Sequence, residues 1–197
     1  EGGRALAEVL FGDVNPSGKT TMTWPVKYSD TAPSKSKLDF PGSGGKVNYS
    51  EGIFVGYRYY DQNKMKVLFP FGHGLSYTTF KYSGLKITPD AISKGKMKVQ
   101  VSFDVTNTGK REGKEIAEVY VHDYEASAPR PPRELKGFKK ISLKPGEKQR
   151  VTITLDESSF SFFDPKSNKW TVEPGKFQIQ VGASSRDIRL SGDITLK

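Results

Sequence analysis

From position 80 to the end of the chain, apolar residues recur at every second position over short stretches. Residues 96–105 alternate polar side chains with methionine, valine and phenylalanine, and residues 115–122 and 149–155 repeat the pattern. Because successive side chains of a strand point to opposite faces of a sheet, each stretch predicts a half-buried β-strand. Further strands are predicted at residues 80–85, 135–143, 160–164, 169–172, 177–182 and 189–196.

Turn signals separate these stretches, among them Asn-Thr-Gly-Lys at 107–110 and Lys-Pro-Gly-Glu at 144–147. About seven or more short strands at such spacing predict an antiparallel, immunoglobulin-like β-sandwich over residues 80–197. The chain contains no cysteine, so the disulfide-bonded framework is excluded and the fibronectin type III-like variety is favoured. We therefore expect a mainly β fold whose sandwich has no catalytic site of its own.

The first residues have a different pattern. Ala5, Leu6, Val9 and Leu10 follow helical spacing, and Gly12 is placed to end that helix. Residues 19–25 then predict a short strand that a proline terminates. One helix and one strand cannot bury their apolar faces alone, so they require a larger body. A chain that opens within a helix is interpreted as a fragment.

Residues 26–79 have no sustained periodicity. Residues 29–45 are rich in Ser, Pro, Gly and Lys and predict a surface loop, whereas residues 50–61 and 68–77 are dense in aromatic residues and glycines. Ser50 is a candidate cap for a short helix. Long irregular stretches are unusual inside an independent domain. We interpret this one as an arm that lies across neighbouring domains.

Composition excludes several classes of function. The formal net charge is +9 and the pI is about 9.5, but the lysines are dispersed and no nucleic-acid-binding motif accompanies them. We therefore expect no nucleic-acid partner and interpret the charge as a solvated surface. No signal peptide or membrane span is visible in the sequence. Without cysteine, a thiolate zinc site and a cysteine nucleophile are excluded.

Several motifs, in order along nearly the whole chain, resemble glycoside hydrolase family 3 and the fibronectin type III-like domain that ends many of its members. The motifs are Gly18–Pro25, Tyr49–Asp61, Phe69–Thr78, Arg133–Phe138, Leu143–Glu147, Glu173–Phe177 and Val181–Ser185. The resemblance implies three regions: residues 1–27 as the remnant of an α/β sandwich domain, residues 28–79 as the arm, and residues 80–197 as the fibronectin type III-like sandwich.

The family resemblance also implies a chemistry that this chain does not itself carry. Family members are β-glucosidases and related enzymes that hydrolyse glycosides with retention, which requires two carboxylates about 5 Å apart. Neither carboxylate motif of the family occurs in these residues, so we expect no catalytic residue, no cofactor and no activity of the chain alone. The expected partners are the N-terminal catalytic domains of the parent polypeptide, and the resemblance favours a periplasmic or secreted parent.

The candidate site residues are few. Glu51, Arg58 and Asp61 either contact the active-site domain or form an ion pair that pins the arm, and the ion pair is favoured. His73 and His122 are interpreted as packing and rim residues, because neither has an evident metal-binding or triad partner.

The two tryptophans are the candidates for stacking on a sugar. Trp24 precedes a proline in a predicted strand and is expected in a core, whereas the exposure of Trp170 is open. Arg130-Pro131-Pro132-Arg133 is either a proline-rich ligand or the start of an edge strand, and the edge strand is favoured. The basic residues from Lys136 to Arg150 either bind an acidic or lignin-like polymer or protect an exposed edge.

Three functions follow as hypotheses. The leading one is a non-catalytic C-terminal part of a family 3 glycoside hydrolase that stabilises the catalytic domains. The second is a module that binds carbohydrate or a polymer surface. The third is one piece of a nicked hydrolase that works only with its N-terminal partner.

Overall fold

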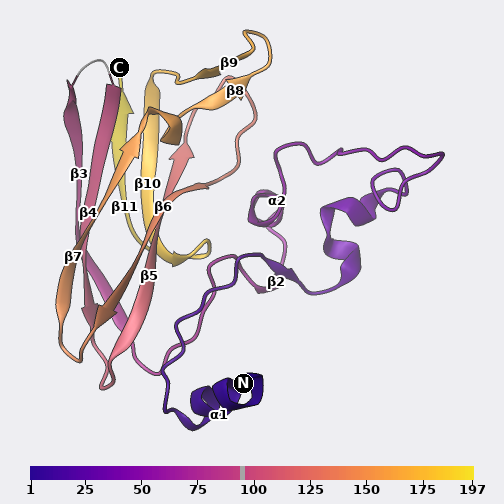
Figure 1. Ribbon diagram of the computed structural model, residues 1–197. Helices are drawn as coiled ribbons and strands as arrows, with labels where there is room; N and C mark the ends of the chain where they lie inside the picture. Colours follow the sequence, from indigo (N-terminus) through magenta and orange to yellow (C-terminus); the bar gives the residue numbers. More distant parts are fainter. Residues whose placement is uncertain (94–95) are drawn as a thin grey trace.

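The computed structural model describes residues 1–93 and 96–197, with side chains outside residues 90–96, and shows a mainly β protein (Figure 1). Two antiparallel sheets face each other. One has the strand order β3-β4-β7 and the other has the order β11-β10-β5-β6. The strands are β3 (Phe80–Ser93), β4 (Lys96–Asn107), β5 (Gly113–Asp123), β6 (Glu134–Leu143), β7 (Lys148–Asp156), β10 (Gly175–Ser184) and β11 (Asp187–Leu196). The predicted antiparallel β-sandwich is confirmed, and its first strand begins at Phe80.

The core lies between these two sheets and follows the period-two pattern. Strand β4 contributes Val101 and Phe103, and strand β5 contributes Val119, each with an exposed fraction of 0%. The alternate positions Ser102 and Asp104 are only partly buried. Full burial of a valine or phenylalanine side chain stabilises the fold by about 1.5–3 kcal/mol, so this inner face accounts for the pairing of the sheets.

A small hairpin extends one end of the sandwich. Strands β8 (Phe162–Asp164) and β9 (Lys169–Thr171) pair antiparallel beyond the 3₁₀-helix η3 (Glu157–Ser159). Its turn contains Asn168 in a left-handed conformation, with φ 54°. Asparagine tolerates this region better than most residues, so the turn is compatible with its sequence.

The N-terminal helix α1 (Gly2–Phe11) ends where the sequence predicts. Gly12 adopts φ 84°, a left-handed conformation, and its amide donates to the Val9 carbonyl oxygen. The strand predicted over residues 19–25 is much shorter than expected: only β1 (Trp24–Pro25) forms, paired with β2 (Val67–Phe69). Thr20 exchanges backbone hydrogen bonds with the turn at residues 72–73 instead of joining a ladder.

The segment between β1 and the sandwich is largely irregular, and besides β2 it contains short helical turns. They are η1 (Tyr28–Asp30), η2 (Ala32–Lys35) and α2 (Tyr57–Gln62). The proposed cap at Ser50 was wrong, because α2 begins after Gly56 and the Ser50 hydroxyl donates to Asp39 instead. None of the helices in the described part of the chain has the length and apolar character of a membrane span.

Candidate functional site

Exposed apolar side chains are concentrated in the first seventy-nine residues. Among the described side chains, eighteen of the large exposed hydrophobic ones precede the sandwich, and only Tyr124, Phe138, Phe163 and Trp170 belong to it. Exposed apolar side chains that gather in one region of a protein often mark an interaction surface. We call the exposed apolar side chains of residues 6–77 the docking face.

Helix α1 is the clearest part of the docking face. It buries none of its residues, and Leu6, Leu10 and Phe11 are all exposed. An isolated helix of this length is marginal in water unless tertiary packing supports it. Figure 1 shows α1 standing away from both sheets at the end of the sandwich opposite the β8–β9 hairpin. The helix therefore has the character of an element that packs on another body.

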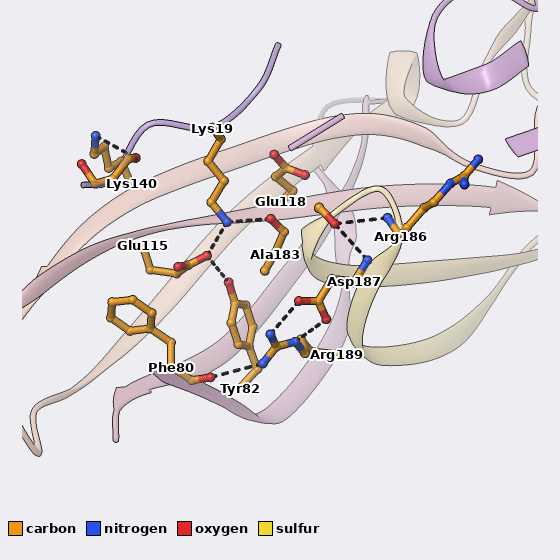
Figure 2. A network of polar contacts seen from close by, with 12 residues as sticks. Lys19, Phe80, Tyr82, Glu115, Glu118, Lys140, Ala183, Arg186, Asp187 and Arg189 are labelled. Carbon is orange, nitrogen blue, oxygen red and sulfur yellow. Dashed lines mark hydrogen bonds and ion pairs between the residues drawn. The ribbon is translucent and has the colours of Figure 1, made fainter. Parts of the chain in front are cut away.

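The docking face is joined to the sandwich by a network centred on Lys19 (Figure 2). The Lys19 Nζ atom lies 2.7 Å from the Glu115 carboxylate and donates to the Ala183 carbonyl oxygen at 2.6 Å. The Tyr82 hydroxyl donates to the same Glu115 oxygen at 3.1 Å. Lys19 and Glu115 are nearly buried, so each charge depends on the other for compensation.

Titration behaviour in this network follows from burial. Desolvation raises the pKa of Tyr82 well above its usual value, and the neighbouring Glu115 charge acts in the same direction. At the rim of the network, the bidentate hydrogen bonds from Arg189 hold the pKa of Asp187 below its usual value. Because its pKa is raised, the Tyr82 hydroxyl stays protonated and acts as a fixed donor to Glu115.

A second buried carboxylate, Glu118, lies under the loop that carries Gly72. Burial raises the pKa of Glu118 to about 7, against the opposing effects of the Tyr120 hydrogen bond and the Lys19 charge. The Tyr120 hydroxyl donates to Glu118. A Cβ at Gly72 would come within 2.6 Å of both carboxylate oxygens, and this glycine has φ 79°. The loop can lie this close to the carboxylate only because position 72 has no side chain.

Glu115 and Glu118 do not form a retaining catalytic pair. They are three residues apart on one strand, so their side chains point to opposite faces of the sheet. Glu115 is neutralised by Lys19, and Glu118 is bonded to a tyrosine. Their chemistry is that of a structural junction.

A second anchor joins helix α2 to the hairpin between β10 and β11. Arg186 donates to the Asp61 carboxylate at 2.7 Å and to the Met65 carbonyl oxygen at 2.9 Å. Of the three residues for which an ion pair was favoured, Asp61 forms one, and it joins the arm to the sandwich. Among the described residues, Glu51 and Arg58 take part in none. Nearby, the Tyr57 hydroxyl accepts a hydrogen bond from the Leu135 amide at 2.8 Å.

The other sequence candidates fall into two groups. Glu51, Arg58 and Trp170 line one groove between the arm and the β8–β9 hairpin, although they are far apart in the sequence. Trp24 was expected in a core, and that prediction was wrong: its exposed fraction is 51%. Strand β1 has two residues and pairs with β2 in a two-stranded sheet, so among the described residues no larger sheet packs over the indole.

The histidines have packing roles. The His73 ring lies 5.1 Å from the Phe69 ring, and the His122 ring lies 5.0 Å from that of Tyr124. Burial lowers the pKa of His122. In the part of the chain that the structure describes, no three or more acidic, histidine or cysteine side chains converge as a metal site would require.

The basic segments follow strand edges. Arg130 precedes β6 and pairs with Asp123 and Glu134, so the Arg-Pro-Pro-Arg stretch leads into an edge strand and is not a free proline-rich ligand. Lys136, Lys139 and Lys140 lie on β6 and Lys148 begins β7, and each of these strands is at the edge of its sheet, whereas Lys144 lies in the turn between them. This placement is the one that edge protection requires.

Two family models match the chain. Residues 1–57 match the glycosyl hydrolase family 3 C-terminal domain, and residues 115–185 match the fibronectin type III-like domain. The chain is 50% identical over 192 residues to thermostable beta-glucosidase B of Acetivibrio thermocellus, covering 98% of this chain and 25% of that protein. It is 44% identical to an exo-alpha-(1->6)-L-arabinopyranosidase of Bifidobacterium breve, covering 100% of this chain and 25% of that protein.

Solved structures share the fold. A family 3 beta-glucosidase of Bifidobacterium adolescentis superposes with a TM-score of 0.92 at 43% identity, covering 99% of this chain and 28% of that one. The beta-glucosidase DesR of Streptomyces venezuelae, solved with D-glucose, gives 0.93 at 36% identity, covering 100% and 25%. The chain thus spans about a quarter of the length of these relatives. It belongs to glycoside hydrolase family 3, as the C-terminal part that includes the fibronectin type III-like domain.

Proposed function

We propose that this chain is the non-catalytic C-terminal support of a family 3 glycoside hydrolase. In this proposal, residues 1–27 complete an α/β sandwich domain, residues 28–79 form an arm across the catalytic domains, and residues 80–197 hold that arm in place. The observation that carries the proposal is the docking face, because eighteen of the twenty-two large exposed hydrophobic side chains among the described residues belong to it. Three of the four relatives named above are beta-glucosidases, which supports β-glucosides as the substrates of the whole enzyme, whereas the arabinopyranosidase acts on an α-linkage.

The requirements of retaining glycoside hydrolysis indicate which part of the enzyme carries the catalytic residues. Retaining hydrolysis needs one carboxylate as nucleophile and a second as acid and base, about 5 Å apart. The buried acids Glu115 and Glu118 are engaged in the junction and point to opposite faces of their strand. The catalytic pair is therefore assigned to the other domains of the enzyme, which this chain would stabilise by burying the docking face.

The test mixes the chain with the separately produced N-terminal part of the enzyme. We expect no turnover of an aryl β-glucoside by the chain alone, and association with restored activity on mixing. Leu10→Asp should weaken association about tenfold or more, because it removes a buried leucine from the interface. The matched control is Phe138→Asp, which alters an equally exposed side chain on the sandwich and should leave association unchanged. Equal effects of the two variants, or turnover by the chain alone, would contradict the proposal.

A second candidate function is carbohydrate binding, and one observation favours it. The Trp170 side chain has an exposed fraction of 72% and lines the same groove as Glu51 and Arg58. The neighbouring Phe163 ring is inclined at 72° to the indole, so the two rings do not make a flat platform. This geometry favours a single glycan chain over the surface of an insoluble polymer.

A further inference from the structure

A groove with a volume of about 1210 Å³ lies between the arm and the end of the sandwich that carries the β8–β9 hairpin. The arm contributes Glu51 and Phe54 to its walls, and the hairpin contributes Phe163 and Trp170. Pockets for single small molecules usually measure about 300–1,000 Å³. The groove is therefore large enough for several linked units of an oligomer.

The aromatic wall of the groove is held rigidly. Phe163 and Trp170 are cross-strand partners, with ring centroids 5.9 Å apart. The Asp164 carboxylate accepts hydrogen bonds from the backbone amides of Lys166 and Ser167, at 2.9 and 3.3 Å, which fixes the turn. The exposed indole thus stands on a preorganised support, and a ligand would lose little free energy in ordering it.

The floor of the groove is fixed by neutralised charges. The Arg130 guanidinium pairs with Asp123 at 3.0 Å and with Glu134 at 3.1 Å, and it donates to the Phe160 carbonyl oxygen at 2.9 Å. Lys136 lies 2.7 Å from the other Glu134 oxygen. These groups support the groove and leave it little net charge of their own.

The groove as a whole is balanced in charge, although the chain is strongly basic. Its charged lining residues are three acids and three bases: Glu51, Glu134, Glu157, Arg58, Arg130 and Lys136. A balanced lining has no electrostatic preference for an acidic polymer or an anionic membrane. The balance therefore favours a neutral ligand.

Three of these charged groups remain available for hydrogen bonding. Among the described residues, Glu51, Arg58 and Glu157 take part in no ion pair. Carboxylates accept, and the guanidinium donates, hydrogen bonds in the forked geometry that neighbouring hydroxyls can satisfy. A neutral molecule with a C–H face for the indole and hydroxyls along its edges is a sugar.

We propose that this groove binds a segment of a neutral oligosaccharide several units long. Trp170 stacks on the apolar face of one sugar ring, and Glu51 and Arg58 bind hydroxyls of the chain from the opposite wall. The inference deepens the second candidate function and rests on it. Among the described residues, Ile53 is the one side chain of the docking face that also lines the groove, so the docking role and this inference can fail separately.

The two tryptophans allow a direct test on the full chain. In a Trp24→Phe background, Trp170 is the sole tryptophan, so its fluorescence reports on the groove alone. We expect cellotetraose, laminaritetraose or xylotetraose to change this emission saturably. The expected Kd is in the millimolar range or tighter, which corresponds to a binding free energy of about −4 kcal/mol or more favourable. Calorimetry on Trp170→Ala should show binding weakened about tenfold or more, as for a central aromatic anchor. The matched control is Phe138→Ala, which removes an equally exposed aromatic outside the groove and should bind like the unmodified chain.

Three results would overturn the proposal. The first is that none of the neutral tetrasaccharides produces a saturable change. The second is binding that Trp170→Ala leaves unchanged, or binding of tetragalacturonate alone, which would assign the effect to the basic edge strands. The third is that addition of the N-terminal part of the enzyme shields Trp170 from acrylamide quenching and abolishes binding. The groove would then be filled by protein, and the docking proposal would stand.

Discussion

The two regions of this chain use apolar residues in opposite ways. Residues 80–197 turn theirs inward, where Val101, Phe103 and Val119 are fully buried between two sheets. Residues 1–79 leave many of theirs exposed, and helix α1 buries none of its own. Both regions have defined backbone structure, but only the sandwich of residues 80–197 has a hydrophobic core that explains it. The contrast supports the proposal that residues 1–79 pack on a surface that this chain does not itself supply.

The largest effect is expected in the core. Phe103→Ala should lower the free energy of unfolding of the chain by about 3–5 kcal/mol, since it leaves a cavity between the sheets. Leu10→Ala on α1 should change it by less than about 0.5 kcal/mol, because the side chain is exposed. Urea unfolding of both variants measures the difference. Comparable losses would mean that α1 is packed in the isolated chain.

The junction should come next. Lys19→Met leaves the Glu115 carboxylate buried without its cation, which typically costs about 3–5 kcal/mol. We expect a loss near the lower end of that range, because both side chains retain some exposure. The double variant Lys19→Met, Glu115→Gln should recover most of it in the same urea measurement. If the double variant is as unstable as the single one, the loss does not come from the unpaired charge.

The pH dependence of stability tests the second buried carboxylate. Burial raises the pKa of Glu118 to about 7 in the folded chain, above its value of 4.5 in the unfolded chain. The folded state therefore binds more protons between these values, and the contribution of Glu118 to stability is lost as pH rises through about 7. The stability difference between the unmodified chain and Glu118→Gln should fall by up to about 3 kcal/mol between pH 4.5 and 8. A difference that is flat or rises with pH would contradict the burial of the carboxylate.

The smallest effect is expected at the second anchor. Asp61→Asn weakens the ion pair with Arg186, whose side chain is partly exposed, so the loss should be about 1 kcal/mol or less. Hydrogen exchange should quicken in α2 while the strands of the sandwich keep their protection. Faster exchange throughout the sandwich would show that the arm is part of its core.

Many strands of the sandwich can be predicted from the sequence because each is indicated by the residues within it. The alternation from Val99 to Val105 marks a strand and its buried face within a few residues, and Gly12 marks a helix end in the same way. The prediction for Trp24 was wrong because it was made from the neighbouring residues in the sequence. The exposure of its side chain depends instead on which elements pack against the two-residue strand β1. Local pattern predicts an apolar face but not whether the same chain covers it.

The junction and the groove are less predictable because they join distant segments. Lys19 and Glu115 are 96 positions apart, and the arm reaches Trp170 only through the path of the folded chain. No periodicity relates such residues. The sequence did single out Glu51, Arg58 and Trp170 as unusual, but only the fold places them on one groove.

Hydrogen exchange on the isolated chain, and then on the chain mixed with the N-terminal part of the enzyme, tests the central claim most directly. The account predicts that the amides of α1 exchange rapidly in the isolated chain, because a short helix without buried residues opens easily. They should become protected on mixing, while strands β4, β5 and β10 stay protected throughout. Strong protection of α1 in the isolated chain, or no gain of protection on mixing, would contradict the assignment of residues 1–79 as a docking face.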